Sequence, residues 1–185
     1  IFHLDIMDGT FVPNISYGFP IVEAIAKIAT KPLDAHLMIV HPEKYVDRFA
    51  KVGVQMLSFH LNAVDNAGQV LAQIRAAGMS PGLAINPDIP VEKLFPYLDQ
   101  CDYVVLMSVF AGFGGQKFIE ATYNRVETLK AEIERQGVEC LIQVDGGVSA
   151  ANSAKLAELG ADILVAGSAV FKADDPQAVI AEMKA

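Results

Sequence analysis

The sequence predicts an α/β fold, a parallel (β/α)8 TIM barrel of which seven βα units are visible. Three observations lead to this fold class. Short apolar runs alternate with longer amphipathic stretches, no linker or low-complexity segment interrupts the alternation, and polar residues gather where the apolar runs end. Strict alternation indicates a parallel sheet covered by helices, and polar strand ends favour a barrel, whose chemistry lies at that rim.

The strands are expected in the apolar runs, which are short enough for buried parallel strands. These runs are roughly Ile1–Ile6, Leu33–Ile39, Met56–His60, Pro81–Ile85, Tyr103–Met107, Leu141–Val144 and Asp162–Ala166. Helices are expected in the amphipathic stretches between them, which are Phe19–Ala29, Pro42–Lys51, Asp65–Ala77, Val91–Leu98, Glu120–Gln136, Ala150–Leu159 and Pro176–Lys184. Glycine or proline punctuates most of their ends, as at Gly53, Gly78, Gly137, Gly160, Pro42, Pro90 and Pro176.

The order of the units decides between two parallel architectures. A doubly wound open sheet would carry a glycine-rich fingerprint after its first strand, whereas Met7-Asp8-Gly9 follows here. A barrel needs eight βα units, and the chain opens within an apolar run at Ile1 rather than at a methionine. We therefore expect one barrel domain over residues 1–185, N-terminally truncated, running from the second strand to the eighth helix of the complete barrel.

Composition excludes several classes of partner. Lys and Arg total 14 against 22 Asp and Glu, so the net charge is −8, and no basic cluster offers a nucleic-acid surface. No apolar run approaches the ~18–20 residues of a spanning helix, and no signal-peptide pattern opens the chain. Cys101 and Cys140 lack paired metal spacing, which favours reduced thiols. We expect a cytoplasmic protein without nucleic-acid or membrane partners.

One group of polar residues ends the first two strands. His3 and Asp5 are two residues apart, so they share a strand face that points inward in a barrel. Burying both side chains is costly unless they pair with each other or bind a metal ion, and the pattern alone does not choose between these two interpretations. His36 ends the neighbouring strand, either as a core histidine or as part of the same cluster, and Asp34 could orient a histidine.

Two glycine-containing strand ends indicate a phosphate site. Asp145-Gly146-Gly147 follows the sixth apolar run and Gly167-Ser168 follows the last. Loops after the last two strands of such barrels often bind phosphate through backbone N–H groups, although a tight turn would use the same glycines.

Two further features of the same rim have a functional and a structural interpretation. Gly112, Phe113, Gly114 and Gly115 form either a closing lid or a flexible surface loop. Met7, Met38 and Met107 either shield a polar site from water or simply fill the core.

Several long motifs resemble the ribulose-phosphate 3-epimerase family, in the right order and over essentially the whole chain. The residues from His3 to Asn14 resemble its second-strand signature, and Leu33 to Met38 resemble its third strand. The later motifs are similar at Asn86-Pro87, Met107 to Val109, Gly112 to Gln116, Val144 to Val148 and Ala166 to Ser168. Several long motifs in one order are far more specific than a lone glycine pattern.

The resemblance implies a barrel of the ribulose-phosphate-binding type and a metal-dependent 3-epimerase. The reaction would interconvert D-ribulose 5-phosphate and D-xylulose 5-phosphate through a metal-stabilised enediolate, with Asp5 and Asp145 as the acid/base pair. One divalent metal ion, zinc above all with iron(II), cobalt or manganese as alternatives, would be bound by His3, Asp5, His36 and Asp145. His36, Gly146, Gly147, Gly167 and Ser168 would contact the substrate, with Gly112 to Gly115 closing over it, and Met7, Met38 and Met107 would shield the site. The family also implies a homo-oligomer, and a serine of the first βα unit, which this sequence does not contain.

Two departures from the family leave the sugar open. Phe110-Ala111 stands where Asn-Pro is usual, and Asn62 stands where a glutamate is usual. A six-carbon ketose phosphate such as allulose 6-phosphate therefore remains an alternative substrate. A Schiff-base aldolase would need a lysine at a strand end, which the apolar runs lack, and a truncated barrel that binds sugar phosphate without turnover is the non-enzymatic alternative.

Overall fold

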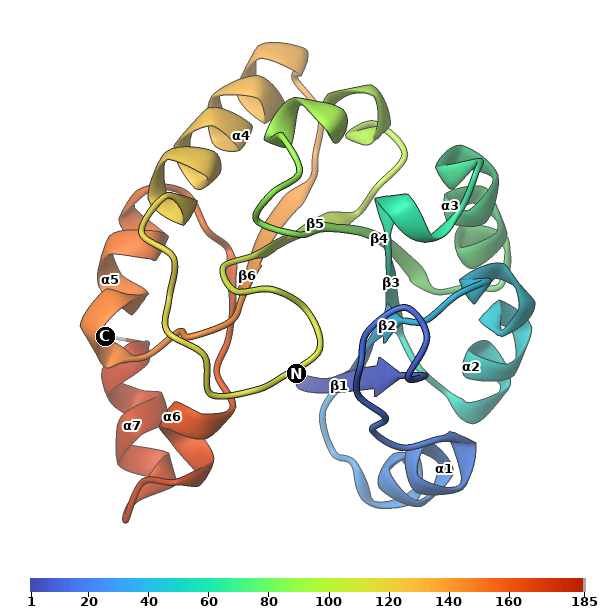
Figure 1. The fold of residues 1–185 in the computed structure, drawn as a ribbon, viewed down its shortest axis with the longest axis horizontal. Coiled ribbons are helices and arrows are strands. Elements are labelled where there is room, and N and C mark those ends of the chain that lie inside the picture. The colour runs from blue at the N-terminus through green and yellow to red at the C-terminus, as the bar shows by residue number, and fades with distance from the viewer. Residues whose placement is uncertain (185) are drawn as a thin grey trace.

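Seven parallel strands form one sheet, in which the strands lie in sequence order. The computed structural model describes residues 1–184, and residue 185, the last of the expected domain, lies outside the described residues. The strands are β1 Phe2–Met7, β2 Leu33–Met38, β3 Met56–His60, β4 Ser80–Ile85, β5 Tyr103–Met107, β6 Leu141–Asp145 and β7 Ile163–Val165. The sheet curls, helices cover its outer face, and the predicted TIM-barrel fold class is confirmed (Figure 1).

The helices follow the strands as the alternation predicts. They are α1 Phe19–Ile28, α2 Val46–Val52, α3 Ala67–Ala76, α4 Thr122–Gln136, α5 Ala150–Glu158, α6 Ser168–Phe171 and α7 Pro176–Met183. Gly53 and Gly137 end α2 and α4 with φ of 93° and 66°, a left-handed conformation that favours glycine. Over residues 1–184, none of the helices has the length and apolar character needed to cross a bilayer.

Two predicted helices differ from the structure. Val91–Leu98 is not an α-helix but two 3-10 turns, Val91–Lys93 and Phe95–Tyr97, because Pro96 has no N–H to donate and would clash inside a helix. Pro42–Lys51 is divided at Tyr45 into the 3-10 turn Pro42–Lys44 and α2. The short helix α6 was not predicted, since only four residues form it.

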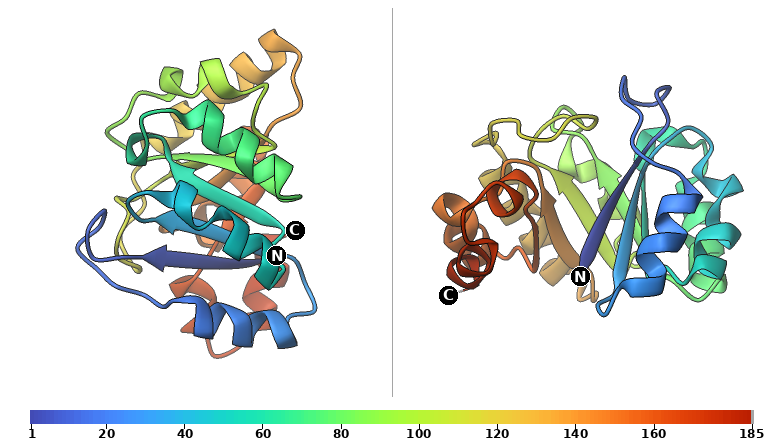
Figure 2. Two further views of the ribbon diagram at one scale, coloured as in Figure 1. Left: turned by 90° about the vertical axis from the view of Figure 1, so that its right-hand side faces the viewer. Right: turned by 90° about the horizontal axis from the view of Figure 1, so that it is seen from below.

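Alternation along each strand separates two cores. In β5, Val104 and Leu106 belong to the large core between sheet and helices, whereas Tyr103, Val105 and Met107 point inward and form a smaller core. The carboxyl ends of the strands lie beyond this inner core. Figure 2 shows the loop after β1 and the loop after β5 reaching out on that same side of the molecule.

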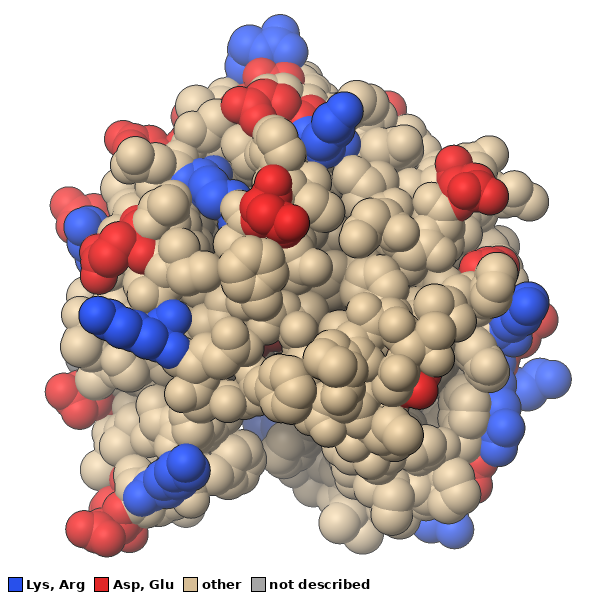
Figure 3. All heavy atoms as spheres, in the orientation of Figure 1, with Lys and Arg blue, Asp and Glu red and all other residues tan. Residues whose placement is uncertain are grey.

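The sheet is open along one side, because β1 and β7 are its two edges and do not pair with each other within the described residues. Figure 3 shows a notch at the lower margin of the molecule. The inward-facing residues of β1 are consequently only half-buried, whereas its outward-facing Leu4 and Ile6 are buried under helices.

Candidate metal centre and active site

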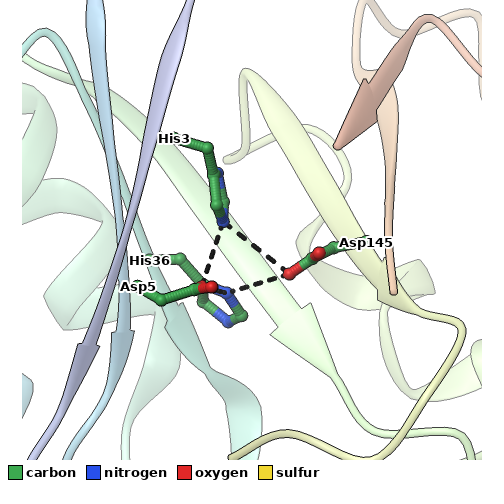
Figure 4. Close-up of side chains that lie close together, drawn as sticks. All are labelled: His3, Asp5, His36 and Asp145. Atoms are coloured by element: carbon green, nitrogen blue, oxygen red, sulfur yellow. Dashed lines mark ion pairs between the residues drawn. The ribbon is translucent and has the colours of Figure 1, made fainter. Parts of the chain in front are cut away.

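Four side chains from three strands converge at the carboxyl rim of the sheet. One atom from each of His3, Asp5, His36 and Asp145 lies within 4.8 Å of the others. His3 Nε2 is 3.3 Å from Asp5 Oδ1 and 3.7 Å from Asp145 Oδ2. His36 Nδ1 is 3.4 Å from Asp5 Oδ1 and 3.5 Å from Asp145 Oδ2 (Figure 4). The structure thus brings together all four residues that the family resemblance implies as ligands.

Strand geometry explains three of the four residues of this cluster. In the β1–β2 pairing, Asp5 lies opposite His36 and His3 lies opposite Asp34, so these inward side chains are neighbours by register. Asp145 is the last residue of β6 and lies opposite Met107 in the β5–β6 pairing. Only the curvature of the sheet carries Asp145 across the interior to β1 and β2 (Figure 4).

The atoms at the centre of the cluster fit a divalent cation. His3 Nε2, Asp5 Oδ1 and His36 Nδ1 are buried and have no hydrogen-bond partner among the described residues, a costly state that a cation would relieve. Nitrogen and oxygen ligands about 2.0–2.2 Å from a tetrahedral ion lie about 3.3–3.6 Å apart, close to the distances observed here. Two imidazoles and two carboxylates suit several transition metals.

A buried carboxylate orients the first histidine. Asp34 Oδ2 accepts a hydrogen bond from His3 Nδ1 at 2.7 Å and one from Gln143 Nε2 at 3.0 Å, and its Oδ1 accepts the Tyr103 hydroxyl at 2.7 Å. Asp34, Tyr103 and Gln143 are all fully buried. Because the Nδ1 proton of His3 is held by Asp34, the neutral form of His3 presents the lone pair of Nε2 to the cluster. The expectation that Asp34 orients a histidine thus agrees with the geometry, and the histidine is His3.

The electrostatics of the cluster pair histidine protons with carboxylates. Burial by itself would lower the pKa of His3, but the hydrogen bond to Asp34 and the nearby Asp5 and Asp145 carboxylates raise it well above its usual value. The pKa of His36 is raised likewise, since Asp145 and Asp5 outweigh burial. Burial would raise the pKa of Asp5, but His3 and His36 lower it strongly. Without a metal ion the two histidines therefore tend to hold protons that a cation would displace.

Two serine hydroxyls hold the main chain beneath the two aspartates. Ser16 Oγ donates to the carbonyl of Asp5 at 2.6 Å and accepts from the N–H of Met7 at 3.0 Å. Ser108 Oγ donates to the carbonyl of Asp145 at 2.9 Å and also contacts the carbonyl of Gly146. Each aspartate is thereby fixed by a loop from outside its own strand.

The predicted phosphate loops differ in how much room they leave. Gly146 and Gly147 have φ of 118° and 64°, and a Cβ on Gly147 would lie 2.6 Å from the backbone nitrogen of Phe118. Close packing against the segment after β5 thus requires glycine here, in addition to any ligand. Gly167 faces open space, and Ser168 begins α6; both residues are exposed.

The predicted lid is tethered at its beginning and its end. Asn14 Nδ2 donates to the carbonyl of Gly112 at 2.9 Å, and the N–H of Ala111 donates to Asn86 Oδ1 at 3.2 Å. At the other end, Gln116 Nε2 donates to the carbonyls of Phe110 and Phe113. The middle of the segment, Phe113, Gly114 and Gly115, is exposed.

The three methionines occupy different surroundings. Met38 and Met107 are buried, whereas Met7 is half-buried beside Met38 in the strand register. Met107 packs in the inner core next to Asp145 on the neighbouring strand. Core packing accounts for Met107, and shielding of the site by the three thioethers stays a prediction.

Several residues of the site, among them Gln143, Tyr103 and His60, were not predicted from the sequence. Gln143 lies two residues before Asp145, so the strand period would have placed it on the inner face. Tyr103 has the same inward parity as Met107, but nothing in the sequence indicates that its hydroxyl reaches Asp34 on a strand 69 residues away. His60 was noted only as a strand end, and the structure places its ring against His36.

The parallel barrel and its rim cluster together define a class of protein, a TIM-barrel enzyme with a candidate divalent-metal site. Comparison with known sequences gives the family. The chain belongs to the ribulose-phosphate 3-epimerase family, whose pattern it matches over residues 1–171, and it is therefore an isomerase that acts on a sugar phosphate.

Individual relatives support the same assignment. The chain is 44% identical over 184 residues to the ribulose-phosphate 3-epimerase of Synechocystis sp., covering 98% of this chain and 80% of the relative. The Bacillus subtilis enzyme of that name is 41% identical, with 98% and 84% covered. The chloroplastic ribulose-5-phosphate-3-epimerase of Arabidopsis thaliana is 43% identical, with 99% and 66% covered.

Solved structures support the fold independently. A mutant tryptophan synthase α-subunit from Pyrococcus furiosus superimposes with a TM-score of 0.64 at 20% sequence identity, covering 89% of this chain and 68% of that one. At this identity the likeness shows a shared barrel architecture and carries no further functional meaning.

Proposed function

We propose that this protein is a metal-dependent 3-epimerase that interconverts D-ribulose 5-phosphate and D-xylulose 5-phosphate. The observation that carries the proposal is the convergence of His3, Asp5, His36 and Asp145, with three buried ligand atoms that lack a protein partner within the described residues. These four residues would hold one divalent ion. When bound, the ion would polarise the carbonyl group next to the carbon that loses its proton.

The two aspartates are suited to transfer the proton. Asp5 projects from β1 and Asp145 from β6, so the two carboxylates approach the centre of the cluster from different strands of the curved sheet (Figure 4). Each turns one oxygen toward the cluster, which leaves its second oxygen available for a proton. An epimerisation needs a base on one face of the carbon and an acid on the other, exchanging roles with the direction of reaction.

The rest of the rim would bind and enclose the sugar phosphate. Backbone N–H groups at Gly146, Gly147 and Gly167 and the hydroxyl of Ser168 would hold the phosphate without a lysine. The segment Gly112 to Gly115 would close over the substrate and exclude water, with Met7, Met38 and Met107 lining the site.

Several finer points belong to the proposal. Zinc is the expected ion, with iron(II), cobalt and manganese as alternatives that the same donor set accepts. Phe110, Ala111 and Asn62, which depart from the family pattern, are the residues that would favour a six-carbon ketose phosphate such as allulose 6-phosphate instead. A homo-oligomer, a cytoplasmic location and a single barrel domain over residues 1–185 remain predictions.

Proton NMR of D-ribulose 5-phosphate in D₂O, with the protein and added zinc, tests the proposal. We expect solvent deuterium at C3 together with xylulose 5-phosphate, and loss of both when EDTA removes the metal. Turnover that is indifferent to EDTA would contradict the metal-dependent mechanism. Exchange with allulose 6-phosphate but not with the pentose phosphate would replace the proposed substrate by the six-carbon alternative.

A further inference from the structure

The last residue of β3, His60, makes an unusual contact with the proposed metal site. Its side chain is fully buried, and its Nε2 lies 2.9 Å from Nε2 of His36. The ring centroids are 5.0 Å apart and the ring planes are inclined by 21°. Because the two nitrogens are so much closer than the centroids, they lie between the rings, which meet nearly edge to edge. This is the geometry of a hydrogen bond in the ring planes.

The local fold holds His60 in this position. Ser58 lies opposite His36 in the β2–β3 pairing, and His60, two residues further along, projects from the same inner face. On another side, the ring of Phe11 from the loop after β1 packs against His60 with centroids 4.9 Å apart. The pair His36–His60 is therefore fixed by two strands and a loop.

The proton in this contact determines the tautomer of both rings. His36 directs Nδ1 at the cluster, and a nitrogen that binds a metal ion must present a free lone pair. A neutral His36 then carries its proton on Nε2 and donates it to His60. His60 must accept through Nε2, which puts its own proton on Nδ1. No other hydrogen-bond partner of His36 Nε2 lies among the described residues.

We propose that His60 is a positioning residue that fixes the tautomer and the ring orientation of His36 for metal binding. Its role toward His36 corresponds to that of Asp34 toward His3, but with a neutral acceptor in place of a carboxylate. The inference rests on the proposed metal site and deepens it, since it assigns a function to a histidine outside the four ligands.

Two substitutions separate the hydrogen bond from packing. His60→Gln places an amide oxygen near the position of Nε2 and keeps an acceptor for His36. His60→Leu fills the space without an acceptor. His41→Leu, at an exposed histidine outside the cluster, is the matched control. Affinity for Co²⁺ and Zn²⁺ is measured by competition with a chromophoric chelator, and the Co²⁺ absorption spectrum reports the ligand geometry.

We expect His60→Leu to bind either ion about 10–100-fold more weakly and to shift the Co²⁺ spectrum, as loss of such a supporting partner does elsewhere. His60→Gln and His41→Leu should stay close to wild type. Thermal unfolding in EDTA shows whether each variant is folded without metal. If His60→Leu does not fold, the metal affinity of His60→Gln still tests the proposal, because a variant that keeps the acceptor should keep metal binding.

Wild-type affinity in a folded His60→Leu protein would overturn the inference, and so would equal weakening in His60→Gln and His60→Leu. If the wild-type protein itself binds neither ion, the metal-dependent function fails, and the inference fails with it. Loss of binding in the leucine variant alone supports both.

Discussion

The buried carboxylate of Asp34 allows the sharpest test of how the metal site is supported. Asp34→Asn keeps the shape of the side chain, and its amide oxygen can take the place of Oδ2, which accepts from His3 and Gln143. The substitution therefore removes the charge and keeps the orientation of His3. Asp34→Ala removes both, and it also leaves the Tyr103 hydroxyl without the acceptor that lies 2.7 Å away.

The magnitudes follow from these contacts. A hydrogen bond to a charged group contributes about 1.5–3 kcal/mol and a neutral one about 0.5–1.5 kcal/mol, so Asp34→Asn should weaken metal binding about tenfold. Asp34→Ala should weaken it about a hundredfold, the upper range for loss of a partner that orients a ligand. Two buried donors without their acceptor, on Tyr103 and Gln143, also cost about 2–6 kcal/mol of stability, a large part of the usual 5–15 kcal/mol.

Chelator competition for Zn²⁺, with urea unfolding of each metal-free variant, measures both effects. Asp102→Asn is the matched control, because its carboxylate pairs with Arg75 at the surface, away from the cluster. Unchanged zinc affinity in both Asp34 variants would refute the assignment of Asp34 to His3. Equal losses in the asparagine and alanine variants would show that charge, rather than orientation, dominates.

Four further predictions follow from the same site. Asp5→Asn and Asp145→Asn should each lower kcat by at least about 10²–10⁴-fold, and normal C3 exchange in both variants would exclude them as the acid/base pair. Ser108→Ala should lower kcat by up to about 10²-fold with KM little changed, because Asp145 loses a main-chain anchor; equal kcat in steady-state assays would contradict this. Gly147→Ala should lower the free energy of unfolding, measured in urea, by more than about 1–2 kcal/mol, whereas Gly114→Ala, with open space at its Cβ, should leave it nearly unchanged. The pKa values of His3 and His36 are raised in the folded protein. The stabilisation from their positive charge is therefore complete below about pH 6.5 and is lost as the pH rises through the folded-state pKa values. Above about pH 6.5 the melting temperature in EDTA should fall while metal affinity rises, and opposite trends would contradict this sign.

Local sequence patterns were sufficient for most elements of the fold. Apolar runs of strand length and helix-ending glycines depend on interactions within a few residues, and the seven strands appear where these patterns placed them. The helix predicted at Val91–Leu98 is wrong because Pro96 interrupts this amphipathic stretch and cannot donate a backbone hydrogen bond. Tethering of the segment around Gly112 by Asn14 and Asn86 could not be anticipated, since it joins three separate loops.

The barrel class and the family follow from the sequence alone, and the family resemblance implies the four candidate ligands. His3 and Asp5 share a face because a strand has a period of two, and His36 lies beside them because consecutive parallel strands pair. The approach of Asp145 to these residues, the support of His3 by Asp34 and the contact of His60 with His36 emerge only in the folded chain. These contacts depend on sheet curvature and on the side-chain directions of residues far apart in the chain, which no local pattern encodes.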